Sequence, residues 1–266
     1  MFPAHLPCRL RFAHACAHVH AFAHACAGGL AHALASLALL AGALATAHAA
    51  EAAPPDTNAS GVFLNAAGDV LTARHAVADC RSLYAVKGAH VAQATVIAQS
   101  PELDLAVLRT ALVPYLSATL ALGDAAPTHS VGVFAEAYAV LQRLPERANL
   151  LSNAMTVPGA EGLQLLSGVK PGASGSAVLG ADGLLLGVVV ERVAAAPHAG
   201  GMVLSRAASS SPVTGATQVR AVPASQVRRF LQAHDVAFSE SGSPQLGPQQ
   251  SPAARASTLS VGVLCG

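Results

Sequence analysis

The chain has 266 residues, of which 53% are apolar, 11% are charged and 4% are aromatic, and its formal net charge at pH 7 is +1. This length suits one large domain or two small ones, and the near-zero charge excludes the basic surface that recruits nucleic acid or an anionic membrane. Partners must therefore be inferred from a site rather than from charge.

The first 49 residues have the features of an export signal. Arg9 and Arg11 precede a stretch whose apolar core, residues 34–44, has the length of a signal-peptide core and is too short to span a bilayer comfortably. Residues 47–49, Ala-His-Ala, give the small-x-small pattern that a signal peptidase needs. We predict a signal peptide over residues 1–49 and a periplasmic or secreted mature chain without a stable membrane anchor. A retained anchor is the alternative.

The same leader is rich in histidine, alanine and cysteine. The hexapeptide FAHACA occurs at residues 12–17 and again at 22–27. Histidine and cysteine this close together can bind zinc or copper. Because the leader precedes the predicted cleavage site, we interpret it as low-complexity sequence and predict no metal site and no cofactor.

Only two cysteines, Cys80 and Cys265, remain after the predicted cleavage. An even number of cysteines in an exported chain fits one disulfide, because thiols can oxidise outside the cytoplasm. Two unpaired buried thiols are the alternative.

Short strands dominate the first half of the mature chain. Residues 50–59 are rich in Ala and Pro and are typical of a short tether. A β-hairpin follows, in which the strands GVFL and VLTA flank a turn at residues 65–69. Turn residues then recur at the spacing of a β-barrel or sandwich rather than of βαβ units. The further strands expected here are residues 83–86, 92–98 and 105–110.

A second set of strands leads to a single helix. From Pro223 the pattern changes, because proline suits a first helical turn and Val227, Phe230 and Leu231 recur at helical spacing. We therefore predict an all-β domain over residues 60–238 that ends in this C-terminal helix. The strands expected before the helix are residues 130–135, 163–167, 177–180, 184–191 and 217–222.

The end of the chain is first polar and then apolar. Residues 239–252 are rich in Gly and Pro and predict a linker. Within residues 253–266, the alternation of Leu259, Val261 and Val263 predicts a terminal strand with Cys265 on its apolar face. A segment this short cannot fold alone, so we expect it to dock on the body.

The segment PGASGSAVL, residues 171–179, contains a candidate nucleophile. Its small residues suit a tight turn, which is the commoner role of a Gly-Ser cluster. They would also let a substrate carbonyl approach backbone N–H groups beside the Ser174 hydroxyl. Gly172 and Ser174 would supply those N–H groups as an oxyanion hole, and Gly175 removes a side chain that would obstruct the approach.

A serine nucleophile needs a base and a group that orients the base. The segment VLTARHAVADC places His75 directly after a strand, where a barrel loop begins. The segment SPELDLAVLRT places Asp104 beside an apolar strand, whose burial would fix and desolvate the carboxylate. A lone histidine is more often structural, and Asp79 and Asp124 also lie between His75 and Ser174. The order of the three motifs on a β-rich chain nevertheless predicts a catalytic triad.

Together, SGVFLNAAGDVLTARHAVADC, SPELDLAVLRT and PGASGSAVLGADGLLLGVVV resemble the trypsin-like serine peptidases of bacteria, and most of all the HtrA/Deg-type branch without a PDZ domain. QVRAVPASQVRRFL resembles that branch's closing strand and helix, so the resemblance covers residues 58–238. It implies two six-stranded β-barrels with the active site between them and hydrolysis of peptide bonds through an acyl-enzyme. It also implies that His75 is the general base, Asp104 its orienting acid and Ser174 the nucleophile.

The chain departs from the family pattern in three respects. The family usually reads GNSGG around the nucleophile, where this chain has Ala173 and Ser176. Its first barrel is short, so an edge is exposed unless the terminal segment fills it. Gly168 stands where trypsin-type enzymes carry an acid for Lys or Arg substrates, which favours an apolar residue before the cleaved bond, although nearby Lys170 keeps an acidic preference open.

Two functions follow from these observations. We predict an exported serine endopeptidase that acts on proteins or peptides and does not bind nucleic acid. The alternative is a catalytically weak trypsin-like fold that serves as a protein-binding scaffold, which the short first barrel and Ala173 favour.

Overall fold

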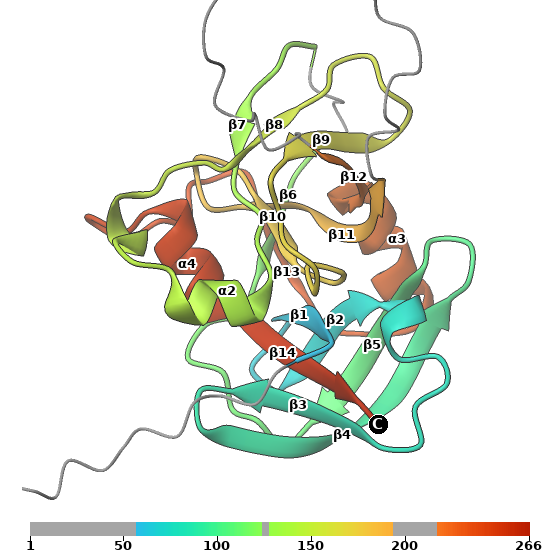
Figure 1. Cartoon of the computed structure of the whole chain (residues 1–266). Helices are drawn as coiled ribbons and strands as arrows, with labels where there is room; N and C mark the ends of the chain where they lie inside the picture. The colour runs from blue at the N-terminus through green and yellow to red at the C-terminus, as the bar shows by residue number, and fades with distance from the viewer. Residues whose placement is uncertain (1–56, 124–127, 194–216) are drawn as a thin grey trace, which may run out of the picture. The chain divides into compact units, whose positions relative to one another are not determined.

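The computed structural model describes residues 57–123, 128–193 and 217–266, and all of them belong to the unit Ala53–Gly266 (Figure 1). The predicted signal peptide, residues 1–49, and most of the predicted tether lie outside the described residues. Within the described ranges, no helix has the length and apolar character needed to cross a membrane.

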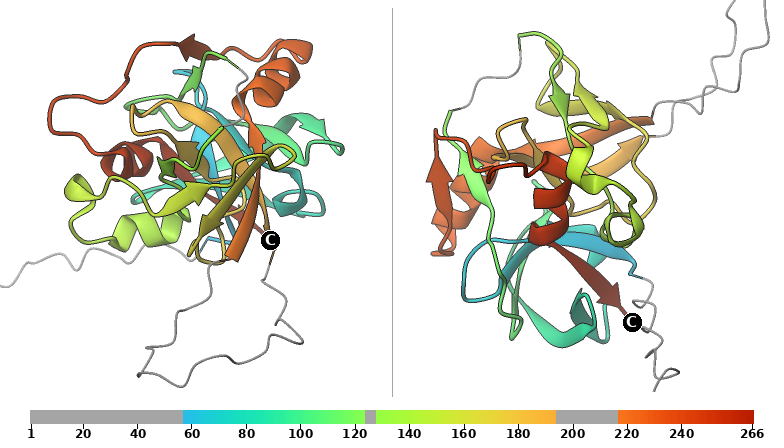
Figure 2. Two further views of the ribbon diagram at one scale, coloured as in Figure 1. Left: turned by 90° about the horizontal axis from the view of Figure 1, so that it is seen from above. Right: turned by 90° about the vertical axis from the view of Figure 1, so that its left-hand side faces the viewer.

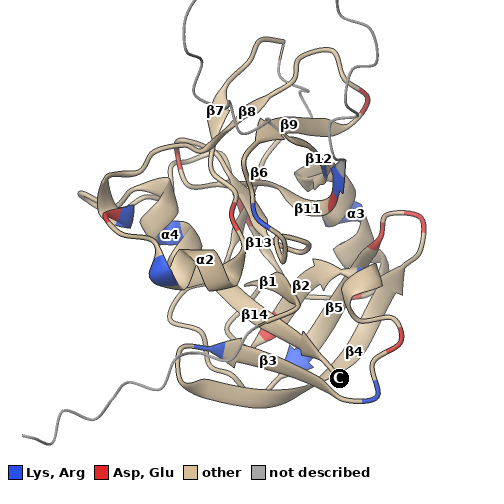
Figure 3. Cartoon of the chain, in the orientation of Figure 1, with Lys and Arg blue, Asp and Glu red and all other residues tan. Residues whose placement is uncertain are grey.

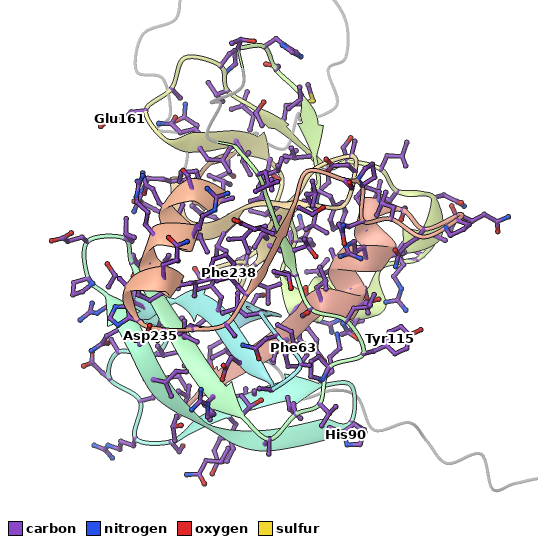
Figure 4. The ribbon with its side chains drawn as sticks, turned by 180° about the vertical axis from the view of Figure 1, so that it is seen from behind. Phe63, His90, Tyr115, Glu161, Asp235 and Phe238 are labelled. Carbon is purple, nitrogen blue, oxygen red and sulfur yellow. A yellow bond between two sulfur atoms is a disulfide. The ribbon has the colours of Figure 1, made fainter. Side chains whose placement is uncertain are left out.

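Six strands form a closed barrel in the order β1-β14-β3-β4-β5-β2. All residues of β1 and β2 are buried. Because successive side chains of a strand point to opposite faces, both faces of these two strands are covered by protein. Phe63, which is labelled in Figure 4, and Val70 pack in the barrel interior. Val62 and Leu71 join a cluster shared with the rest of the molecule. The strands are β1 (Ala59–Phe63), β2 (Asp69–Ala73), β3 (Leu83–Lys87), β4 (His90–Ser100), β5 (Leu105–Thr110) and β14 (Ser260–Cys265).

The last strand of the chain, β14, completes the first barrel, which the sequence analysis expected to be short. β14 lies antiparallel between β1 and β3, with Val261 opposite Gly61 and Val263 opposite Ala85. The right-hand view of Figure 2 shows the dark red strand beside the blue β1. Neither β1 nor β3 is therefore an exposed edge, and the terminal segment docks on the body, as expected from the sequence.

A helix that the sequence analysis missed leads into β14. α4 (Pro252–Leu259) begins at Ser251, whose hydroxyl accepts a hydrogen bond from the Ala254 N–H at 3.1 Å. At its other end, the Lys87 ammonium donates to the carbonyls of residues 257, 258 and 260 at 2.6–2.7 Å. Burial and the charge of Arg147 lower the pKa of Lys87 to about 8, so the ammonium remains its main form at pH 7. β3 is thus bonded to the start of β14.

The second group of strands also closes on itself. Each strand of this ring pairs with the next one in the order β7, β8, β9, β12, β11, β10. A bridge between Phe134, directly after β7, and Leu179 of β10 closes the ring. The N–H of each bridging residue donates to the carbonyl of the other at 2.8–2.9 Å. The strands are β7 (Gly132–Val133), β8 (Ala154–Thr156), β9 (Leu163–Ser167), β10 (Ala177–Leu179), β11 (Leu185–Val193) and β12 (Thr217–Pro223).

Two short strands extend this second sheet beyond the ring. β6 (Thr119–Ala121) pairs parallel with β11, and β13 (Ser239–Ser241) pairs parallel with β6. The sequence predicted only a linker over residues 239–252, but the structure has β13 at its start and the first residue of α4 at its end. A three-residue strand stabilised by a distant partner leaves no periodic signal in its own sequence.

The expected C-terminal helix is α3 (Ala224–Ala233), and its predicted apolar residues Val227, Phe230 and Leu231 are all buried. They belong to one core cluster with Leu71 of the first barrel and Leu179 of the second, so the barrels share a core. The predicted all-β double-barrel fold with this helix is confirmed. The other helices of the described residues are α2 (Tyr138–Arg143) and the 3₁₀ turns η1 (Arg74–Ala76) and η2 (Arg147–Asn149).

The predicted disulfide between Cys80 and Cys265 is present. Cys80 lies in the loop after η1, and Cys265 is the last residue of β14, with a Cα–Cα distance of 5.1 Å. The bond closes a loop with a sequence separation of 185 residues and joins the end of the chain to the loop that follows His75.

Replacing Cys80 and Cys265 together by serine should lower the free energy of unfolding by about 5 kcal/mol on the chain-entropy model, because the unfolded chain gains conformational entropy when this cross-link is removed. Urea unfolding of the oxidised protein and of the double variant measures this difference. The reduced wild-type protein is the control and should match the variant. Equal stability of all three forms would contradict a stabilising role for the bond.

Candidate active site

His75 lies at the point where β2 ends. The strand stops at Ala73, and the single turn η1 carries His75 out of the barrel wall, with the Arg74 N–H bonded to the Asp104 carbonyl at 2.9 Å. The imidazole is about half exposed, with a side-chain accessibility of 49%. His75 is thus fixed through its backbone while its ring remains open to a ligand.

Asp104 occupies the equivalent position directly before β5. Its backbone has a left-handed conformation with φ of 54°, which Asp and Asn adopt more readily than most residues. The next residues, Leu105 to Leu108, are fully buried, as the sequence predicted. One carboxylate oxygen of Asp104 accepts the His75 backbone N–H at 2.9 Å, and the other lies 2.6 Å from His75 Nδ1. Two hydrogen bonds therefore set the position of the histidine.

Ser174 lies in the loop before β10, within hydrogen-bond distance of the same histidine. Its Oγ is 3.0 Å from His75 Nε2. Gly175 follows with φ of +86°, and a Cβ at this position would overlap the Ser60 carbonyl oxygen of β1. Glycine is therefore required beside Ser174 because the loop presses against the first barrel. Of the two other candidate acids, Asp79 is exposed and Asp124 lies outside the described residues.

The backbone around Ser174 leaves two donors available. The N–H groups of Gly175 and Ser176 donate to Val189 and Ala173 at 2.7 and 2.8 Å. Among the described residues, no acceptor is bonded to the N–H of Gly172 or of Ser174. These are the two groups that the sequence predicted for an oxyanion hole, which requires donors that the folded protein has not already used.

Ser60 on β1 supports this loop, and the sequence analysis did not identify it. Its N–H donates to the Ser174 carbonyl at 2.8 Å, and its Oγ donates to the Gly172 carbonyl at 2.7 Å. The same Oγ accepts the Tyr138 N–H at 2.8 Å. Ser60 is fully buried, so the first barrel holds the loop of the second through a serine that solvent does not reach.

A cavity of about 400 Å³ opens over the three side chains. Besides His75, Asp104 and Ser174, it is lined by Val190, Glu191, Arg192 and Arg220, none of which the sequence analysis singled out. Arg220 on β12 pairs with Glu191 on β11 at 2.9 Å, where blue and red segments meet in Figure 3. Lys170 is not part of the lining, so the cations at this cavity come from β11 and β12.

The described part of the chain contains no group of three or more His, Cys, Asp or Glu side chains arranged to bind a metal ion. A carboxylate, an imidazole and a hydroxyl in hydrogen-bonded series are the elements of nucleophilic catalysis by serine.

Residues 59–188 match the family model of the trypsin-like peptidase domain. This match covers β1, the segments of His75 and Asp104 and the loop of Ser174. Over these residues the chain is similar to the trypsin-like peptidases. None of the curated proteins matches the chain.

Several solved structures are similar to the chain at low identity. One is an HtrA-type protease, AlgW, with a decapeptide, at 21% identity and a TM-score of 0.48, over 67% of this chain and 51% of that one. Another is Rv3671c from M. tuberculosis H37Rv, as a serine-to-alanine mutant in its inactive form. Its identity is 18% and its TM-score 0.43, over 66% of this chain and 81% of that one. A third is a serine endoprotease from Yersinia pestis, with 17% identity and a TM-score of 0.44, over 66% of this chain and 57% of that one. The chain spans about half the length of the AlgW structure.

Ser60→Ala should lower the free energy of unfolding by about 1–3 kcal/mol, because the Gly172 carbonyl and the Tyr138 N–H would lose their partner in a buried place. It should also slow the reaction of Ser174 with a serine-directed phosphonate probe. Urea unfolding and the rate of labelling measure the two effects. Ser239→Ala, at an exposed serine, is the control and should change neither. An unchanged unfolding midpoint in Ser60→Ala would show that Ser60 does not hold the loop.

Proposed function

We propose that the chain is an exported serine endopeptidase in which Ser174, His75 and Asp104 form the catalytic triad. The observation that carries the proposal is the hydrogen-bonded series from Asp104 Oδ2 to His75 Nδ1 at 2.6 Å and from His75 Nε2 to Ser174 Oγ at 3.0 Å. In this arrangement Nδ1–H donates to the carboxylate, which leaves Nε2 free to accept the serine proton.

The proposed reaction has two stages. Ser174 Oγ attacks the carbonyl carbon of the peptide while its proton moves to His75 Nε2, and the oxyanion is bound by the N–H groups of Gly172 and Ser174. The imidazolium then protonates the departing amine, which leaves an ester on Ser174. A water molecule, deprotonated by His75, hydrolyses this ester and returns the enzyme to its starting state.

The two observations that favoured the scaffold alternative are weakened by the packing of the described residues. The alternative rested on an incomplete first barrel and on Ala173, but β14 completes that barrel. Ala173 is fully buried in the core of the second barrel and does not line the cavity of the triad. A side chain at that position therefore packs inside the protein, and its replacement for Asn gives no reason to expect inactivity.

Ser174→Ala and His75→Ala should each reduce hydrolysis of casein by several orders of magnitude, and the double variant should be scarcely slower than either single one, because the triad acts as a unit. Asp104→Asn should cost roughly 10⁴-fold by favouring the wrong histidine tautomer. Asparagine tolerates the left-handed backbone at this position, so this change tests chemistry rather than folding.

Asp79→Asn is the matched control for the carboxylate, since Asp79 is exposed in the loop after His75. It should leave hydrolysis unchanged. The catalytic proposal is wrong if purified Ser174→Ala hydrolyses casein as fast as the wild type, or if the wild type never reacts with the phosphonate probe.

The export part of the proposal concerns residues outside the described ranges and rests on the sequence alone. The exported protein should begin near Ala50, directly after the Ala-His-Ala site. N-terminal sequencing of the protein recovered from the periplasm or the medium tests this. An active, membrane-attached protein that keeps its leader would contradict it.

A further inference from the structure

Arg255 is a buried cation without a counter-charge. It lies on α4 with 4% of its surface exposed. In the part of the chain that the structure describes, its side chain makes one hydrogen bond, from Nε to the Gly183 carbonyl at 2.9 Å, and no ion pair. A guanidinium has five N–H donors, so four have no protein acceptor here.

The position of this guanidinium is fixed by the turn that accepts its one hydrogen bond. Gly183 has φ of +77°, and a Cβ at that residue would lie 2.8 Å from Arg255 Cδ. Glycine is therefore needed for the arginine stem to pack against the turn. The packing of the stem and the Nε hydrogen bond together set where the guanidinium lies.

Arg255 lines a second cavity, of about 410 Å³, which shares no residue with the cavity of the triad. Ser117, Thr119 and Gln245 contribute hydroxyl and amide groups to its wall, and no Asp or Glu is part of the lining. Tyr115 lies at its rim with 90% of its surface exposed, at the edge of the molecule in Figure 4. The volume is within the range of about 300–1,000 Å³ that is usual for small-ligand sites.

These features specify the charge and shape of a ligand. Burial lowers the pKa of Arg255, but a guanidinium remains charged in proteins, so a bound anion would offset the cost of its burial. Arg255 is the one charged residue among the described residues that line this cavity. Its single positive charge neutralises the single negative charge of a carboxylate, but not the two negative charges of a phosphate. The planar guanidinium also matches a carboxylate with two parallel hydrogen bonds. The exposed Tyr115 ring offers an apolar surface next to this point.

We propose that this cavity binds a peptide carboxylate through hydrogen bonds from Arg255. An apolar residue of the peptide, next to the one that carries the carboxylate, packs against the Tyr115 ring. The carboxylate can belong to an acidic side chain or to a peptide C-terminus, because both present the same group. The proposal does not depend on the catalytic triad.

Isothermal titration of the full mature chain with N-acetyl-Leu-Glu-amide tests the proposal. The matched probe N-acetyl-Leu-Gln-amide should bind about 10- to 100-fold more weakly, because it cannot form the charged hydrogen bonds. N-acetyl-Leu-Leu with a free carboxylate, compared with its amide, tells whether a C-terminus is also accepted. Equal binding of the Glu and Gln peptides would overturn the proposal, and so would equally tight binding of inorganic phosphate.

Two variants assign the binding to this cavity. Arg255→Met should abolish binding of the Glu peptide while its unfolding midpoint stays equal to or above that of the wild type, since replacing an uncompensated buried charge by an apolar chain is often neutral or stabilising. Tyr115→Ala should weaken binding several-fold without affecting folding. Val113→Ala, at a residue 88% exposed and outside the cavity lining, is the control. Unchanged binding in Arg255→Met, or in Tyr115→Ala if Arg255→Met does not fold, would overturn the proposal.

Discussion

The structure depends on the pairing of β14 between β1 and β3. Without this strand, two strands of the first barrel would have unpaired edges, and the N-terminal part of the chain would form an open sheet. β1 is also the strand that contacts the loop of Ser174, through the Ser60 bonds to the carbonyls of Ser174 and Gly172. The last strand therefore stabilises the strand that positions Ser174, although the two are far from each other in the sequence.

Three independent contacts hold β14 in place. The disulfide fixes its end to the loop after His75, Lys87 binds the carbonyls at its start, and α4 packs in the shared core through Leu259. The contacts differ in chemistry, so they respond to different conditions: reduction affects the first, and deprotonation of Lys87 affects the second. The C-terminal strand is thus part of the same packed body as the loop of Ser174.

The parts predicted from the sequence are those with a local signal. His75, Asp104 and Ser174 each lie within three residues of an apolar strand, and the helical spacing of Val227, Phe230 and Leu231 predicted α3. α4 was missed because its alanine-rich sequence has no strong apolar period, although Ser251-Pro252 is a recognisable start signal. β13, the Ser60 bonds and the Glu191–Arg220 pair arise from segments distant in the sequence, and no local pattern encodes them.

Amide hydrogen exchange in the intact oxidised protein, followed residue by residue by NMR, tests the central claim that β14 is an inner strand of the barrel that holds Ser174. The amides of Val261 and Val263 should exchange as slowly as that of Leu71 in β2, and the Ser60 amide, bonded to the Ser174 carbonyl, should share this protection. Exchange of Val261 and Val263 at the rate of an unstructured peptide, with Leu71 still protected, would place β14 outside the barrel and contradict the account.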